Sequence, residues 1–364
     1  MPQNDEDCAK GDSMTADDNL SYKNVGIDIG KMDQVKQGMA GLVRTPDKRV
    51  INPLGAFAAL YSLENLEGIE NPVLVLKAEE PGSKQKLAFD FGFEDSICHD
   101  MINHLVNDII VMGAKPLAVL DVIITGGINE SMITTLVRET AAACRNNECS
   151  LVGGETSIQP GIISHDLCVL SSSIVGLVDK KNIIDGSKIN EGDCILAVSS
   201  NGLHTNGYTL VRKMIEMEGA IVTKEVTEGR TFLQCVMLPH TAYYPIIKDI
   251  MQLESVHGMA HITGGGIKGN LCRIIPEGLH AQIDLTKIIT LPIFKYIKNF
   301  RSIDDDEMLA TFNCGVGLIL VVSPSCKREI QNHINATTHC YEIGIIRKTT
   351  NNEKVIFQNC LDWR

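Results

Sequence analysis

The sequence predicts a mixed α/β (α+β) protein, and three features of the chain support this prediction. Short apolar runs of strand length alternate with longer segments whose apolar residues recur at helical spacing. Pairs or triplets of glycine follow several of the apolar runs, as in strand-to-helix turns. The chain has 364 residues, 44% of them hydrophobic, which is enough to bury the cores of two or three domains.

The first regular elements are expected after residue 71. An apolar run at 73–76 predicts a strand, and a polar loop follows at 79–84. A helix then opens at Ser96, because Ile97, Met101, Leu105 and Ile109 fall on one face, and it ends before the glycine at 113 and the proline at 116. Beyond it we expect a strand at 117–124, a helix at about 130–145, and a strand at 150–152 that runs into a Gly-Gly-Glu-Thr turn.

The composition changes at 178–193, a charged connector between two apolar strands, and we expect the domain boundary there. The chain is thus divided into an acidic disordered tail at 1–21, with order beginning near Tyr22, and two domains at 22–178 and 179–364. The second domain is expected to contain strands at 194–199, 256–262 and 314–322. Its predicted helices lie at 208–217, from Ile267 onward, and at 324–334.

Charge and composition narrow the class of partner. The chain carries 33 basic and 45 acidic side chains, a net charge of −12, and only 5% aromatic residues. Nucleic-acid binding normally needs a basic surface, so a small-molecule partner is favoured. No apolar stretch approaches the ~20 residues that cross a bilayer, and the polar, acidic start of the chain is unlike a leader peptide. We therefore expect a cytoplasmic protein without a membrane partner.

The twelve cysteines show no Cys-x-x-Cys pair and no spacing typical of a zinc site. Several, such as Cys168 and Cys194, lie inside apolar runs, where cysteine behaves as a small hydrophobic residue. We expect reduced thiols with a structural role, although a reactive thiol among them stays open.

Three glycine-containing segments are candidate binding loops. The loop at 199–207 joins a strand to a helix, and its free N–H groups would suit an anion, although such turns are often only tight connections. The second segment, His261 to Gly266, contains three consecutive glycines, and its histidine is either functional or a structural core residue. In the third, at 151–156, Glu155 could bind magnesium or cap a helix.

Taken in order along the chain, these segments resemble the phosphoribosylformylglycinamidine cyclo-ligase (aminoimidazole ribonucleotide synthetase) family. The similarity starts at 22–28 and extends to about residue 358. The strings that carry it are LVND at 105–108, GAKPL at 113–117, an aspartate at 121, LVGGET at 151–156, DGSK at 185–188, SSNGLHTNGYTLVRK at 199–213, AHITGGG at 260–266 and TFNCGVG at 311–317.

The resemblance implies a two-domain fold and a homodimer joined through the N-terminal domains, with ATP bound near that interface. It also implies a reaction in which MgATP activates the formyl oxygen of formylglycinamidine ribonucleotide and the amidine nitrogen then closes the imidazole ring. Such chemistry needs acidic metal ligands, a lysine and backbone N–H groups around phosphate.

Residue by residue, the resemblance assigns four sets of site residues. The catalytic set is Lys84, Asp108 and His261, and the metal set is Asp108, Glu155 and Glu79. The cofactor-binding set is Glu79, Gly82, Ser83, Lys84, Asn107 and Asp121. The substrate-binding set is Gly202, His204, Thr205, Asn206, Gly264, Gly265 and Gly266.

This chain departs from the family pattern on the nucleotide side. The family's Thr-Asp-Gly-Val-Gly-Thr-Lys loop is replaced by Ala-Glu-Glu-Pro-Gly-Ser-Lys at 78–84, which puts Glu80 where a glycine approaches phosphate. At about 4 Å two like charges cost about 4 kcal/mol at an effective dielectric constant of 20, and Pro81 removes an N–H donor. Ile158 replaces a carboxylate, and Ala310 replaces an arginine.

Two hypotheses about function therefore stay open. One is an ATP-dependent cyclo-ligase, or a close relative that acts on an analogous ribonucleotide. The other is a diverged paralogue without ligase activity, which binds a ribonucleotide or serves as a partner subunit. The loops assigned to the ribonucleotide match the family better than the nucleotide loop does. The enzyme is favoured because the long matched strings extend into both domains.

Overall fold

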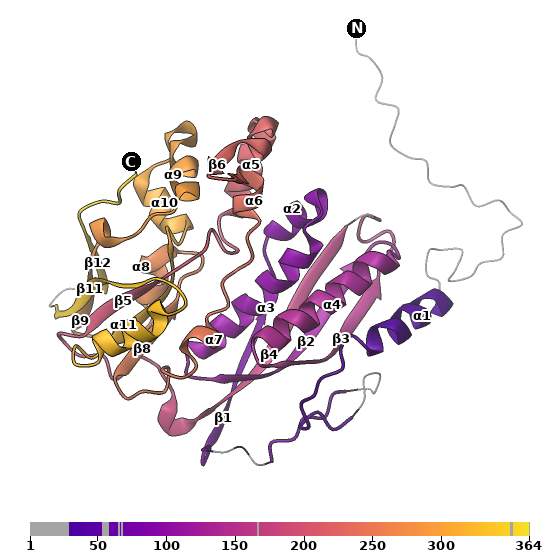
Figure 1. The fold of residues 1–364 in the computed structure, drawn as a ribbon, viewed down its shortest axis with the longest axis horizontal. Helices are drawn as coiled ribbons and strands as arrows, with labels where there is room; N and C mark the ends of the chain where they lie inside the picture. Colours follow the sequence, from indigo (N-terminus) through magenta and orange to yellow (C-terminus); the bar gives the residue numbers. More distant parts are fainter. Residues whose placement is uncertain are drawn as a thin grey trace, which may run out of the picture.

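The structure is a computed structural model that describes residues 29–363 apart from 53–57, 65, 67, 166, 350 and 351. The predicted tail at 1–21 and the expected start of order near Tyr22 lie outside the described residues. Two sheets organise the described chain (Figure 1). No helix among these residues is long and apolar enough to cross a bilayer.

The first sheet has four strands in the order β1-β4-β2-β3. They are β1 (Pro72–Glu79), β2 (Lys115–Thr125), β3 (Ser150–Ile158) and β4 (Cys168–Asp179). β4 runs antiparallel to both β1 and β2, whereas β3 runs parallel to β2. The parallel pair is joined by a helix, as a crossover between parallel strands requires.

Helices cover one face of this sheet (Figure 1). α3 (Glu94–Ile110) lies against β1, β4 and β2, and α4 (Glu130–Asn146) lies against β3 and β2. The predicted apolar stripe of α3 is fully buried in this layer, so hydrophobic burial fixes the helix on the sheet. α2 (Lys84–Phe91) precedes α3, and α1 (Ile29–Ala40) packs on α4.

The second sheet has six strands in the order β12-β9-β11-β5-β10-β8, all antiparallel except the pair β12–β9. The strands are β5 (Cys194–Ser199), β8 (Val256–His261), β9 (Leu279–Asp284), β10 (Val316–Val322), β11 (Cys340–Lys348) and β12 (Val355–Gln358). Every residue of the central strand β10 is buried. A near-continuous apolar run is expected for a strand that is covered on both faces.

The helices of the second half are short. They are α5 (Tyr208–Met217), α6 (Phe232–Val236), α7 (Tyr244–Ile247), α8 (Gly266–Leu271), α9 (Pro292–Asn299), α10 (Asp305–Thr311) and α11 (Lys327–Asn335). Between α5 and α6, β6 (Glu225–Thr227) and β7 (Arg230–Thr231) form a separate small hairpin that packs against α6 and α9. 3-10 turns lie at 180–182, 219–223, 285–287 and 300–302.

The predicted mixed α/β class is confirmed, and most predicted elements are present. β5 and α5 have the predicted bounds, and β2, α3 and α4 differ from prediction by one to three residues at their ends. β3 was predicted to end before its glycines, but it continues through them to Ile158 because the ladder to β2 persists after a bulge at Val152. The eleven cysteines that the structure describes are all free thiols, as predicted.

Candidate active site

A polar stripe on α3 joins the two halves of the molecule. Ser96 Oγ donates to the Met237 carbonyl at 2.8 Å, and Asn103 Nδ2 donates to the His240 carbonyl at 2.6 Å. One turn further on, Asn107 Nδ2 donates to the carbonyl of residue 241 at 2.8 Å, and its Oδ1 accepts from the N–H of residue 243 at 3.1 Å. The stripe therefore satisfies buried backbone groups of the 237–243 segment, which has no strand partner of its own.

Lys84 lies at the centre of this junction and is completely buried. Its Nζ lies 2.7 and 2.8 Å from the two carboxylate oxygens of Asp100 and donates to the carbonyls of His204 at 3.1 Å and Leu238 at 2.7 Å. An ammonium has three N–H donors, so these partners use all of them. Burial lowers the pKa of Lys84, against the opposing charge and hydrogen bond of Asp100.

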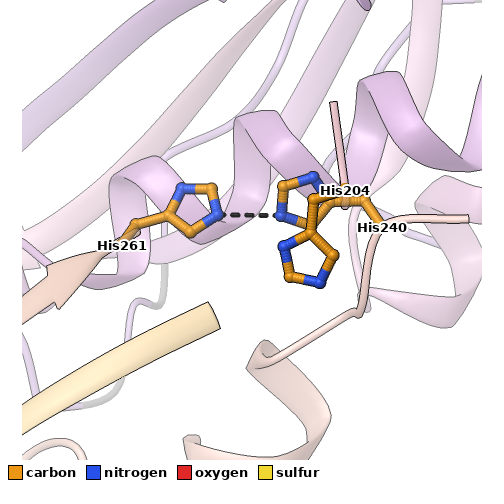
Figure 2. A group of neighbouring side chains, drawn as sticks. All are labelled: His204, His240 and His261. Carbon is orange, nitrogen blue, oxygen red and sulfur yellow. Dashed lines mark hydrogen bonds between the residues drawn. The ribbon is translucent and has the colours of Figure 1, made fainter. Parts of the chain in front are cut away.

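Four histidines meet beside this ion pair. His104 comes from α3, His204 from the loop after β5, His240 from the segment before α7, and His261 from the end of β8. The rings of His204 and His240 stack with centroids 3.8 Å apart, and Nε2 of His240 lies 2.8 Å from Nε2 of His261 (Figure 2). His104 contacts both His240 and His261, with ring centroids 5.4 and 5.2 Å apart. All four histidines are buried.

Asp108 connects this histidine cluster to a row of charges on β1. Its Oδ1 lies 2.7 Å from Nδ1 of His261, and its Oδ2 lies 3.0 Å from Nζ of Lys77. Lys77 also pairs with Glu79 at 2.9 Å. Burial raises the pKa of Asp108, but the hydrogen bond from His261 and the charges of His261, His104 and Lys77 outweigh it, so the pKa lies below its usual value.

Three of the four histidines, His104, His204 and His240, are held in the neutral form. Burial, followed by the charge of His261, lowers the pKa of His104 to about 4. The pKa values of His204 and His240 also lie well below the usual value, first because of burial and then because of the neighbouring histidines and Lys84. Near neutral pH, Asp108 therefore supplies negative charge, and these three imidazoles offer lone pairs rather than positive charge.

Strand β10 needs a glycine at position 317, where it passes the histidine cluster. At Gly317 a Cβ would lie 1.8 Å from the hydroxyl of Tyr243 and 2.7 Å from Cε1 of His204. The Tyr243 hydroxyl donates to the Ser199 carbonyl at 2.9 Å, which ties the 237–243 segment to the end of β5. Strand β10 can pass this close to the histidine cluster only because residue 317 has no side chain.

The predicted phosphate loop follows β1. Glu80 is exposed, and its Oε2 accepts from the N–H of Gly82 at 2.9 Å and from Nε2 of Gln85 at 3.0 Å. The side chain of this glutamate thus occupies an N–H group of the loop that the resemblance assigns to phosphate. Ser83 precedes α2 without a side-chain capping bond, and Pro81 is buried.

Comparisons with known proteins show which family the chain resembles. Residues 71–178 match the N-terminal domain of the AIR synthase related protein family, and residues 190–356 match its C-terminal domain. A phosphoribosylformylglycinamidine cyclo-ligase of Neisseria meningitidis serogroup C is 35% identical over 336 residues, which cover 92% of this chain and 97% of the relative. The chain belongs to the phosphoribosylformylglycinamidine cyclo-ligase family. The enzyme of that name from Methylobacillus flagellatus is 38% identical over 330 residues, covering 90% and 94% of the two chains.

Solved structures with lower identity share the fold of this cyclo-ligase family member. The hydrogenase maturation protein HypE of E. coli aligns with a TM-score of 0.63 at 17% identity, covering 92% of this chain and 98% of HypE. A thiamine-monophosphate kinase from Stenotrophomonas maltophilia aligns with a TM-score of 0.61 at 16% identity, covering 91% and 96%. At these identities the likeness shows the fold alone.

The structure brings together only part of the metal set predicted for a cyclo-ligase. Glu79 and Asp108 share Lys77 on the helix-covered side of the first sheet. Glu155 pairs in register with Val122 on β2, and its neighbour Gly154 pairs with Asp121. Because successive residues of a strand face opposite sides, Glu155 lies on the face away from α3, beyond two intervening strands.

Several of the other residues that the resemblance assigns to the site are already hydrogen-bonded within the protein or buried. Lys84 and Asn107 use their donors on protein partners, and the Gly202 carbonyl accepts from Asn313 Nδ2 at 2.9 Å. Asp121 is buried, and burial raises its pKa to about 7. On the substrate side, Thr205 Oγ1 lies 3.1 Å from Nδ1 of His104.

Two substrate-side features remain open to a ligand. Nδ2 of Asn206 is buried without a hydrogen-bond partner. Oδ1 of the same side chain lies 3.3 Å from the position that a Cβ on Gly264 would take, so this amide faces the glycine triplet. Gly264 and Gly265 are exposed, whereas Gly266 is buried at the start of α8. An unpartnered amide donor beside exposed backbone N–H groups suits an anionic or hydroxyl-bearing ligand.

Sequence reasoning missed several residues of the site. His104 and His240 were not singled out, and neither were Asp100 and Asn103. A signal was present in α3, because its polar residues 96, 100, 103, 104 and 107 recur three or four positions apart on the side opposite the apolar stripe. The same spacing is typical of a solvent-exposed helix face, so it did not separate a buried polar contact from a solvated one. His240 lies in a segment without periodicity and gave no such signal.

Proposed function

We propose that the protein closes the imidazole ring of formylglycinamidine ribonucleotide in an ATP-dependent reaction of purine biosynthesis. One observation supports this most directly, beyond family membership. The family strings around Asn107–Asp108, 199–207 and 260–266 are far apart in sequence but converge at the junction between the two sheets. Function depends on such a site rather than on the fold.

Of the three residues assigned as catalytic, we place Asp108 against the substrate. Its side chain is 21% exposed, whereas those of His261 and Lys84 are 2% and 0% exposed. Asp108 stays ionised and can hold a positively charged amidine or accept its proton. We assign His261 and Lys84 positioning roles, because His261 orients the carboxylate of Asp108 and Lys84 fixes the loop that carries His204.

The residues on β1 and α3 suit magnesium. Glu79 and Asp108 present carboxylate oxygens, the ligand type that magnesium prefers, and both lie within ion-pair distance of Lys77. We propose that these two residues hold the magnesium that accompanies ATP. ATP supplies the phosphoryl group that turns the formyl oxygen into a leaving group. Lys77 then balances the charge of the two carboxylates on the protein side.

Two observations favour the second candidate, a paralogue that binds a ribonucleotide without ligase activity. Glu80 occupies the N–H of Gly82, and Lys84 has no donor left for phosphate. Both features lie on the nucleotide side, while the substrate-side loops keep an open glycine pair and an unpartnered amide.

Turnover of the purified protein separates the two candidates. Formylglycinamidine ribonucleotide, ATP and magnesium are supplied together, and the aminoimidazole product and ADP are both measured. The cyclo-ligase forms them in a one-to-one ratio, and Asp108→Asn lowers the rate at least 100-fold. Ribonucleotide binding by calorimetry without product or ADP would establish the paralogue instead.

We also propose that two copies associate through the first sheet. The face of this sheet away from α3 carries Leu74, Leu76 and Leu120, which are 50%, 68% and 42% exposed. An apolar patch of this kind marks an association surface, and the family resemblance implies a second copy as its partner. Light scattering should give twice the 39.8 kDa of one chain, and Leu76→Glu should yield the monomer.

These proposals give the two domains different roles. The domain at 22–178 would carry the dimer surface and the ATP side, and the domain at 179–364 would carry the substrate loops. We place the protein in the cytoplasm, where its substrate class and its free cysteines fit a reducing compartment.

A further inference from the structure

Three buried histidines converge on one point from three separate segments of the second half. His204, His240 and His261 each bring a ring nitrogen to within 4.8 Å of the other two (Figure 2). The exposed fractions of these residues are 0%, 1% and 5%. We propose that His204, His240 and His261 form a binding site for a divalent transition-metal ion such as Zn²⁺. This inference does not rest on the proposed function.

The hydrogen bond from Asp108 determines which nitrogen of His261 is available. An ionised carboxylate can only accept, so Nδ1 of His261 carries the proton that it shares with Asp108 at 2.7 Å. In the neutral ring Nε2 then accepts a hydrogen bond from Nε2–H of His240, 2.8 Å away, and a bound metal ion would take the place of that proton. A carboxylate that orients a ligating histidine through the opposite nitrogen is the usual support of a protein-bound transition metal.

The protein leaves other nitrogens of this cluster without partners. Nδ1 of His204 and Nδ1 of His240 are both buried and make no hydrogen bond. A buried polar atom is normally satisfied, and each exception needs an explanation. A metal ion bound through either of these two Nδ1 atoms would supply that atom with a partner that the protein does not provide.

Small adjustments would produce a metal geometry. Zinc binds imidazole nitrogen at about 2.0–2.1 Å in a tetrahedral arrangement, which places neighbouring ligand nitrogens about 3.3 Å apart. The His240 and His261 nitrogens are 2.8 Å apart, and all three ligand atoms lie within 4.8 Å of one another. Three protein ligands would leave the fourth position for water or another ligand.

Chemistry distinguishes this site from the magnesium site proposed above. Imidazole suits zinc, copper, nickel and iron, whereas magnesium prefers oxygen ligands. A second group, His104, Asp108 and His261, is also close enough to bind an ion. There Oδ1 of Asp108 is already hydrogen-bonded to Nδ1 of His261 at 2.7 Å, so these two atoms satisfy each other. Lys84, the cation nearest the first group, is paired with Asp100.

Cobalt provides a direct test with the full-length protein. The protein is freed of metal with a chelator and titrated with Co²⁺, whose visible absorption becomes intense in tetrahedral sites. We expect one equivalent to bind, and one equivalent of Zn²⁺ to displace it. His240→Gln should weaken cobalt binding at least 100-fold, and Asp108→Asn 10- to 100-fold. The exposed His333→Gln serves as the matched control and should bind like the wild type.

Further outcomes decide against the site. A failure of the folded wild-type protein to bind one equivalent would overturn the proposal, and so would unchanged binding by a folded His240→Gln variant. Thermal melting and circular dichroism of each variant establish that it is folded. If His240→Gln does not fold, His204→Gln replaces it with the same expectation. Loss of binding in His104→Gln with retention in His240→Gln would place the ion in the other group, and a thiolate-to-cobalt charge-transfer band would place it on cysteine.

Discussion

The carboxylate of Asp108 on α3 and the imidazole of His261 at the end of β8 lie 2.7 Å apart, although 153 residues separate them in sequence. This contact fastens the first half of the molecule to the second at the point where the family strings meet. It also explains why a histidine at a strand end is buried, because its Nδ1 has an ionised partner.

We expect Asp108→Asn to destabilise the protein by about 1–3 kcal/mol, since a charge-assisted hydrogen bond and the ion pair with Lys77 are lost together. Urea unfolding measures the change. Asp90→Asn is the control, because Asp90 forms an exposed pair with Lys86 at 2.9 Å and should change the free energy of unfolding by less than about 0.5 kcal/mol. Equal, small effects of both substitutions would show that the Asp108–His261 contact contributes little.

Lys84 and Asp100 should behave as one buried unit. Lys84→Met leaves Asp100 buried without its cation, and we expect a loss of about 3–5 kcal/mol. Adding Asp100→Leu should restore part of that loss, because a buried pair can often be replaced by apolar residues. A double-mutant cycle in urea measures the coupling. Additive losses would contradict this structural role, and an intact free energy of unfolding in Lys84→Met would return the lysine to the nucleotide site.

The sequence predicted correctly those helices and strands whose ends coincide with a glycine or with a change from apolar to polar residues. β5 and α5 have the predicted bounds because an apolar run ends at a polar loop and Gly207, in the left-handed region with φ of 78°, starts the helix. β3 differs because its two glycines look like a turn in sequence. In the structure Gly154 stays in the ladder, and the missing side chain leaves room for Asp121, whose Oδ1 would lie 1.9 Å from a Cβ.

The site was predictable only where the family strings carried it. Asp108, His204 and His261 were assigned through the resemblance, and the structure brings them to one junction. His240 and Asp100 belong to the site through a hydrogen bond in which the backbone N–H of His240 donates to the carboxylate of Asp100. The two residues are 140 positions apart in sequence. No local periodicity reports such a contact, because it depends on how two sheets dock rather than on any single element.

Glu80 should weaken ATP binding. Glu80→Gly removes a negative charge and frees the N–H of Gly82, so we expect tighter ATP binding at low magnesium and a smaller gain at high magnesium. Isothermal titration of the wild type and the variant at both magnesium concentrations measures this. Glu80→Gln separates the two causes, because it keeps an acceptor for Gly82 but loses the charge. Equal affinity in all four conditions would show that this carboxylate does not govern nucleotide binding.

Gly264 offers a cleaner test of the substrate loop than Gly265, which has φ of 92° and resists any side chain. Gly264→Val should obstruct the exposed glycine pair beside Asn206 and weaken binding of formylglycinamidine ribonucleotide at least tenfold, or about 1.4 kcal/mol. Its free energy of unfolding should change by less than about 1 kcal/mol, because the position is exposed. Calorimetry and urea unfolding measure the two effects.

Gly266 supplies the contrast for that experiment. A Cβ there would lie 1.9 Å from the Leu309 carbonyl oxygen, so Gly266→Ala should lose stability and binding together. Unchanged ribonucleotide affinity in a folded Gly264→Val protein would remove the glycine triplet from the binding site.

Asp121 should make the protein less stable as pH rises from about 4 to about 7. Burial raises its pKa to about 7, above the 3.8 of an exposed aspartate. Folding therefore takes up a proton between about pH 4 and 7, and the free energy of unfolding falls across that window and levels off above it.

The variant Asp121→Asn has no such proton and leaves a neutral group beside Gly154. The variant should gain on the order of 2–4 kcal/mol over the wild type at pH 8 and much less at pH 4.5. Urea unfolding at both pH values tests this, with exposed Asp249→Asn as the control. A gain that is the same at both pH values would show that the ionisation of Asp121 does not limit stability.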